Sequence, residues 1–95
     1  MKPLSDQEID DQLTNLRGWS RGDHCIEKTY AFKNFLRAMW FVNTVGYLAE
    51  TRNHHPDILI HYNEVTLRNW THAANAVTER DFDLAAAIDE SIPIE

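Results

Sequence analysis

Histidines are the side chains of this 95-residue chain best suited to moving protons near neutral pH. Two of them, His54 and His55, are adjacent and stand directly before Pro56. Glu50 lies four residues before His54, and His72 follows further along the chain. Imidazoles donate and accept protons without large tuning, so this group predicts general acid/base catalysis.

The same residues also have purely structural explanations. Glu50 falls in the last turn of an expected helix, where a carboxylate is unfavourable unless it is partnered, and His54 is the natural partner. Otherwise Glu50 is a solvated surface glutamate. His54 and His55 would then be polar loop residues, and His72 a solvent-facing residue at a strand end. Asp81 fits the N3 position of a capping box, a role compatible with ligand contact.

Metal and nucleophile chemistry have weak support. The chain has no HExxH or CxxC motif, and no two histidines stand four apart on one helix, so no metal site is expected. Cys25 lies in a strand-like pattern with no base near it in sequence. There is no glycine-rich phosphate loop. His24 and His61 are expected at the surface.

Charge and hydropathy limit the partners. A formal net charge of −6 argues against direct binding to nucleic acid or to an anionic membrane. No apolar run approaches the roughly 20 residues of a membrane span, and the acidic start of the chain is not a signal peptide. One cysteine cannot form an internal disulfide. We expect one soluble cytoplasmic domain over residues 1–95.

Three helices are expected. Ser5 and Glu8 form a capping box before a helix that reaches Leu16, with Gly18 as a stop. Asn34 caps the longest helix, which ends before Pro56 because proline disfavours helical geometry at the preceding residue. A third helix begins at a second capping box and closes at Pro93. That box consists of Thr78 and Asp81.

Four strands are expected between these helices. After a short extended segment at Trp19, a turn at 21–23 leads to a strand whose apolar face Lys28 interrupts. Two more strands flank a turn at 62–64. The order helix, two strands, helix, two strands, helix predicts an α+β fold: a four-stranded antiparallel sheet with helices on one face. The open edges of such a sheet favour pairing between subunits.

Together these residues closely resemble the pterin-4a-carbinolamine dehydratase family. The resemblance rests on Glu50 with His54-His55-Pro56 after three residues, then Tyr62, Thr71-His72 and TERD ending at Asp81. NLRGW and DFDLAAAID extend it over almost the whole chain. It favours the functional explanation of the histidines over the structural one.

The resemblance implies an activity. It is the removal of water from 4a-hydroxytetrahydrobiopterin, giving quinonoid dihydropterin and so supporting recycling of the cofactor of aromatic amino acid hydroxylases. It also implies a homodimer or homotetramer and no metal or organic cofactor. The acid/base pair would be His54 and His72, in either order, while His55, the third implied catalytic residue, would hold and orient the pterin and assist.

The remaining implied site residues bind or surround the pterin. Glu50 would orient or polarise a histidine. Asp81 and Trp19 would form walls or lie behind the ligand-contacting residues. The segments that would line the pterin, partly through backbone, contain Pro56, Thr71, Ala73 and Ala74.

Three residues depart from the family pattern. Relatives commonly have glycine where this chain has Ala76, so a positive φ there would strain the loop. Asn69 replaces an apolar strand residue, and Ala74 stands where animal forms have cysteine.

The alternative is a non-catalytic binding module on the same fold, since animal relatives also act as dimerisation partners of a transcription factor. Exposed apolar residues on the long helix, such as Trp40, Phe41 or Tyr47, would support this function.

Overall fold

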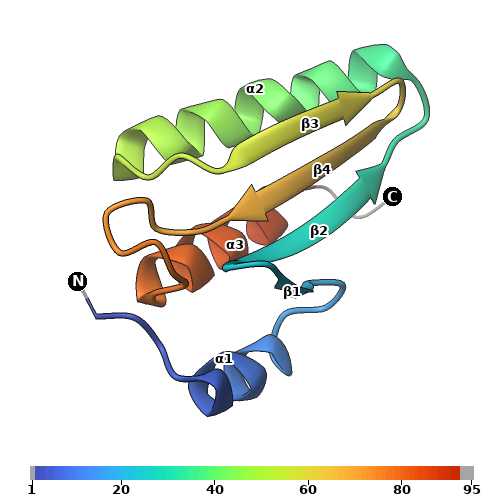
Figure 1. Cartoon of the computed structure of the whole chain (residues 1–95). Coiled ribbons are helices and arrows are strands. Elements are labelled where there is room, and N and C mark those ends of the chain that lie inside the picture. Colours follow the sequence, from blue (N-terminus) through green and yellow to red (C-terminus); the bar gives the residue numbers. More distant parts are fainter. Residues whose placement is uncertain (1, 93–95) are drawn as a thin grey trace.

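The computed structural model describes residues 2–92, so the expected helix stop at Pro93 lies outside the described residues. The elements follow the expected order. They are α1 (Asp6–Leu13), β1 (Ser20–Gly22), β2 (Cys25–Ala31), α2 (Phe35–Arg52), β3 (Asp57–His61), β4 (Glu64–Asn69) and α3 (Glu79–Ser91). The α+β class predicted from the sequence is confirmed (Figure 1).

The strands form one antiparallel sheet in the order β1-β2-β4-β3. The long helix α2 lies behind β3 and β4, and α3 lies on the same side of the sheet (Figure 1). This arrangement brings the C-terminal end of α2, the end of β4 and the start of α3 to one end of the molecule. None of the helices in residues 2–92 is both long and apolar enough to cross a membrane.

Capping residues begin each helix where the sequence predicts. Ser5 accepts a hydrogen bond from the backbone N–H of Glu8, and the Glu8 carboxylate accepts one from Ser5 N–H. Asn34 accepts a hydrogen bond from Arg37 N–H at the start of α2. The Thr78–Asp81 box begins α3 in the same reciprocal way. These bonds satisfy N–H groups that have no partner within the helix.

Two local predictions are wrong. The first helix ends at Leu13 rather than Leu16, because residues 14–18 form turns that lead to Gly18 at φ +85°. The first hairpin turn is Asp23-His24 rather than residues 21–23, since Gly22 pairs with Cys25 and His24 adopts a φ of 58°.

The core lies between the sheet and the helices. Its largest fully buried side chains include Phe41, Ile26 and Leu67. The expectation that Phe41 would be exposed on α2 is therefore wrong: the ring packs against Tyr30 and Phe32 on the core side of the helix. The neighbouring face of α2 remains exposed, and it carries Leu36, Trp40 and Tyr47.

Candidate active site

A cavity of about 250 Å³ opens where α2 ends, β4 ends and α3 begins. The three histidines predicted to carry the chemistry, His54, His55 and His72, all line it. Its other lining residues are Asn53, Trp70, Thr71, Ala73 and Arg80. The fold therefore gathers imidazoles from two segments about 17 residues apart into one space, because the end of α2 and the end of β4 meet there.

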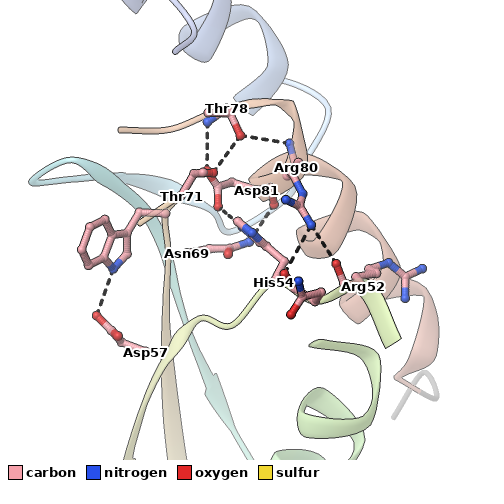
Figure 2. A network of polar contacts seen from close by, with 10 residues as sticks. Arg52, His54, Asp57, Asn69, Thr71, Thr78, Arg80 and Asp81 are labelled. Carbon is pink, nitrogen blue, oxygen red and sulfur yellow. Dashed lines mark hydrogen bonds and ion pairs between the residues drawn. The ribbon is translucent and has the colours of Figure 1, made fainter. Parts of the chain in front are cut away.

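The carboxylate of Asp81 contacts the His54 ring. The Nε2 atom of His54 lies 2.5 Å from Oδ1 of Asp81, and the two side chains are 7% and 0% exposed (Figure 2). An ionised carboxylate only accepts hydrogen bonds, so Nε2 carries the proton of this bond. In the neutral ring Nδ1 is then the unprotonated nitrogen, which can accept a proton.

The Asp81 carboxylate is itself fixed. Its Oδ2 accepts hydrogen bonds from the Thr71 hydroxyl and the Thr78 backbone N–H, both at 2.9 Å. The two threonine hydroxyls lie 2.7 Å apart. Asn69, fully buried on β4, donates to the Asp81 backbone carbonyl at 2.7 Å. The network joins β4 to the first turn of α3, so His54 rests on two elements besides its own (Figure 2).

A second carboxylate partners His55. The Nε2 atom of His55 lies 2.9 Å from Oε1 of Glu50, and both side chains are exposed, at 55% and 81%. The expected pairing of Glu50 with His54 is therefore wrong, because Asp81 already occupies the Nε2 atom of His54. The left-handed C-cap at Asn53 (φ 50°, ψ 45°) turns the chain so that the adjacent rings point to different partners.

His72 is held differently. Its ring is exposed and makes no hydrogen bond to any side chain in residues 2–92, but its centroid lies 4.1 Å from that of the Trp70 ring. Both nitrogens of His72 are thus available to a ligand in the cavity.

Sequence reasoning missed Trp70 and Arg80. The Nη2 atom of Arg80 donates to the backbone carbonyls of Arg52 at 2.8 Å and of Asn53 at 3.3 Å (Figure 2). This cation sits at the C-terminal end of α2, where the helix dipole favours it, and it fixes the turn that precedes His54. The only signal in the sequence was an arginine two residues after a predicted N-cap; its contact with Arg52, 28 residues away, depends on the fold.

The other expected site residues lie at different distances from the cavity. Thr71 and Ala73 line it, whereas Pro56 and Ala74 are not among its lining residues. Trp19 does not reach it: the indole packs edge-on against Tyr30 in the core and donates to Asp89 at 2.9 Å. The expectation that Trp19 forms a wall of this site is not supported by that geometry.

Two of the three departures from the family pattern make contacts that the structure shows. Ala76 does not have a positive φ, because Asn75 takes the left-handed conformation instead, at φ 50°. The loop closes through paired backbone hydrogen bonds between Thr71 and Ala76. The buried Asn69 side chain donates to the Asp81 backbone carbonyl, while its Oδ1 atom is buried without a hydrogen-bond partner among the described residues. Nothing in the structure explains Ala74.

Residues 2–92 contain no group of three or more histidine, cysteine, aspartate or glutamate side chains placed to hold a metal ion. The histidines instead pair singly with carboxylates or with an indole. Such an arrangement can position several proton donors and acceptors around a small ligand.

Comparisons with known proteins identify the class to which this fold and site belong. The family model described as pterin 4 alpha carbinolamine dehydratase matches residues 2–91, and the chain belongs to this family. A relative from Chloroflexus aurantiacus is 49% identical over 90 residues, covering 95% of this chain and 97% of the relative. A relative from Sulfurisphaera tokodaii is 43% identical with the same coverage. Both are provisionally named pterin-4-alpha-carbinolamine dehydratases.

Solved structures share the fold. A crystal structure from Brucella melitensis, described as a transcriptional coactivator/pterin dehydratase, is 32% identical with a TM-score of 0.89, covering 94% of this chain and 97% of that one. A pterin dehydratase-like protein described as a RuBisCO assembly factor of the alpha-carboxysome is 20% identical with a TM-score of 0.63, covering 79% and 86%. The second similarity concerns the fold alone.

Proposed function

We propose that the chain is a 4a-hydroxytetrahydrobiopterin dehydratase, a hydro-lyase that uses histidine acid/base catalysis and no cofactor. The observation that carries the proposal is the convergence of His54, His55 and His72 on one cavity in a member of this family. The product, quinonoid dihydropterin, would be reduced again, so the enzyme would support tetrahydrobiopterin recycling beside an aromatic amino acid hydroxylase.

In the proposed reaction the bond between C4a and the hydroxyl oxygen breaks. An acid gives its proton to the leaving hydroxyl, which departs as water, and a base removes the proton from N5. The N5 electrons then form the double bond to C4a. His54 and His72 are the proposed pair, in either order, since each lines the cavity and each keeps a ring nitrogen that makes no hydrogen bond to a side chain in residues 2–92.

The remaining residues have supporting roles in this proposal. Asp81 orients the His54 ring through the 2.5 Å contact, and Glu50 orients His55, which holds the pterin. Thr71, Ala73 and the adjoining backbone of Pro56 and Ala74 would contact the pterin ring.

The test is the decay of 4a-hydroxytetrahydropterin, generated in situ by a pterin-dependent hydroxylase and followed by absorbance. The wild type should accelerate the decay, and the His54→Ala/His72→Ala double variant should be slower by roughly 10²- to 10⁴-fold, the usual contribution of general acid/base groups. His61→Ala is the matched control, because His61 is exposed on β3 away from the cavity. Circular dichroism checks that each variant is folded.

If folded wild type does not accelerate the decay, the enzyme proposal is wrong. A His61→Ala variant that lost as much activity as the double variant would show that the assignment of the pair is wrong.

A second candidate function is a binding module, with or without catalysis. The observation that favours it is the apolar face of α2, where Leu36 is 77%, Tyr47 71% and Trp40 50% exposed. Exposed apolar residues gathered on one helix mark an interaction surface. The Brucella relative's description as a transcriptional coactivator is consistent with such a role.

The same face would serve the expected homodimer or homotetramer. Leu36→Glu/Tyr47→Glu should lower the mass measured by sedimentation equilibrium while leaving secondary structure intact. Retained turnover in the smaller species would separate association from catalysis. An unchanged mass would exclude this face as the contact.

A further inference from the structure

The side chain at position 70 stands between two cavities. The histidine cavity of about 250 Å³ and a second cavity of about 170 Å³ share Trp70, and no other lining residue within 2–92 belongs to both. The second cavity is polar: its remaining lining residues are Asp23, His24, Asp57, Arg68 and Asn75.

The indole is fixed in this position from two directions. Its Nε1 atom donates to Oδ2 of Asp57 at 3.1 Å, the contact drawn to Asp57 in Figure 2. Its ring also packs against the exposed ring of His72, with centroids 4.1 Å apart and planes inclined by 41°. Asp57 pairs with Arg68 in the β3–β4 register, so the anchor of the indole is a strand rather than a loop.

The volumes of the two cavities indicate the role of the Trp70 side chain between them. Sites for small molecules usually measure about 300–1,000 Å³, so the histidine cavity is small and suits a compact ligand. If the two cavities were joined, their combined volume would fall within that range. The added space would also offer polar side chains, among them the Arg68 guanidinium, whose Nε lies 3.6 Å from the Glu27 carboxylate.

We propose that Trp70 determines specificity by closing the histidine cavity against the polar cavity, so that pterins with compact 6-substituents bind and those with long, polar 6-substituents are excluded. The inference rests on the proposed function, since it assigns the size of the pterin that the same site accepts. Because the indole packs on His72, it also positions that ring.

The test measures binding of two stable probes, 6-methyl-7,8-dihydropterin and 7,8-dihydrofolate, by isothermal titration calorimetry. Wild type should bind the methyl compound more tightly. In Trp70→Ala the ratio of the two Kd values should move at least tenfold in favour of dihydrofolate. In Asp57→Asn the ratio should stay within twofold of wild type, because the asparagine oxygen still accepts the indole N–H.

Leu59→Ala, which truncates an exposed apolar side chain on β3, is the matched control and should leave the ratio unchanged. If Trp70→Ala does not fold, Trp70→Leu replaces it, with a shift of at least threefold expected. The positioning role has its own readout: Trp70→Phe, which keeps a ring beside His72, should retain more of the wild-type kcat than Trp70→Ala or Trp70→Leu.

A ratio within twofold of wild type in the folded Trp70 variant overturns the inference while leaving the proposed function intact. If wild type binds neither probe and shows no dehydratase turnover, both the inference and the proposed function are overturned. Equal kcat values in the Trp70 variants overturn the positioning role alone.

Discussion

Three imidazoles line one cavity, yet each is held by different means. His54 is buried and hydrogen-bonded to the fully buried carboxylate of Asp81. His55 and its carboxylate partner, Glu50, are both exposed to solvent. His72 has only the Trp70 ring beside it. Exposed ion pairs contribute only about 0–1 kcal/mol to the free energy of unfolding. Of the three histidine contacts, the one between His54 and Asp81 is therefore the one expected to affect stability strongly.

At this scale we predict that Asp81→Asn destabilises the chain and slows turnover together. Asparagine at position 81 has a single side-chain oxygen in place of two, so it cannot accept all three hydrogen bonds now made by His54, Thr71 and Thr78 N–H, and at least one buried donor loses its partner. The free energy of unfolding should fall by about 1–3 kcal/mol, measured by urea denaturation.

Asp83→Asn is the control for that experiment, because Asp83 is an exposed acidic residue of the same helix. An Asp81→Asn variant as stable and as active as Asp83→Asn would contradict the role given to the buried network.

The elements depend on their first turns. Both α1 and α3 begin with a reciprocal capping box, but the α1 box is exposed and the α3 box is buried within the site network. Hence the α3 box couples helix formation to the placement of His54, while the α1 box affects stability alone.

For α1 we predict that Glu8 makes the free energy of unfolding depend on pH in the acid range. The hydrogen bond from the Ser5 backbone, followed by that from its side chain, lowers the pKa of Glu8 below its usual 4.5. A lowered carboxyl pKa contributes stability that is present above the ordinary pKa and is lost as pH falls through the lowered value. Wild type should therefore lose more stability than Glu8→Gln between about pH 6 and pH 3.

The measurement is urea denaturation at successive pH values. Parallel curves for wild type and Glu8→Gln through the acid range would show that the box contributes nothing to acid stability.

Across the whole molecule, a cluster around Asp89 joins the sheet to α3 at the end away from the histidines. Tyr30 donates to Asp89 at 2.6 Å, Trp19 at 2.9 Å and Lys28 at 3.2 Å. Lys28 also lies 4.7 Å from the centre of the Tyr30 ring. This explains how a lysine occupies the core face of β2: its ammonium group is paired rather than buried alone.

From this cluster we predict how the free energy of unfolding falls at alkaline pH. Burial, and then the hydrogen bond to Asp89, raise the pKa of Tyr30 far above its ordinary value. A raised pKa contributes stability that is complete below the ordinary pKa, near 10, and is lost as pH rises beyond it. Tyr30→Phe should therefore show a flatter loss of unfolding free energy above about pH 10 than wild type.

Thermal or urea denaturation at alkaline pH checks this, with Tyr62→Phe as the exposed control. An equally steep loss in Tyr30→Phe and wild type would show that other groups set the alkaline limit.

Local chemistry explains which parts of the fold could be predicted from sequence. Capping boxes and the Asn34 N-cap depend on residues three apart, so the starts of α1, α2 and α3 were predictable. The end of α1 was not, because residues 14–18 form turns before Gly18, and the Asp23-His24 turn was not, because it depends on the pairing of Gly22 with Cys25. Phe41 was misplaced because almost every side of α2 carries apolar residues, which leaves the buried face undefined.

The candidate site divides in the same way. The histidines stood out by type and spacing, but their partners depend on contacts between elements far apart in sequence. Asp81 lies 27 residues from His54, and Arg80 lies 28 from the carbonyl of Arg52. Trp70 could not be distinguished from a core residue until its neighbours, Asp57 and His72, were known.

The cavity also lies within a single continuous part of the chain. Glu50 through Asp81 supply every histidine of the site and every carboxylate that holds one, while α1 supplies none. A ligand bound there would join the end of α2, the end of β4 and the start of α3. Backbone amides of those segments should therefore exchange with deuterium more slowly when the cavity is filled, while the amides of α1 keep the rate of the empty protein.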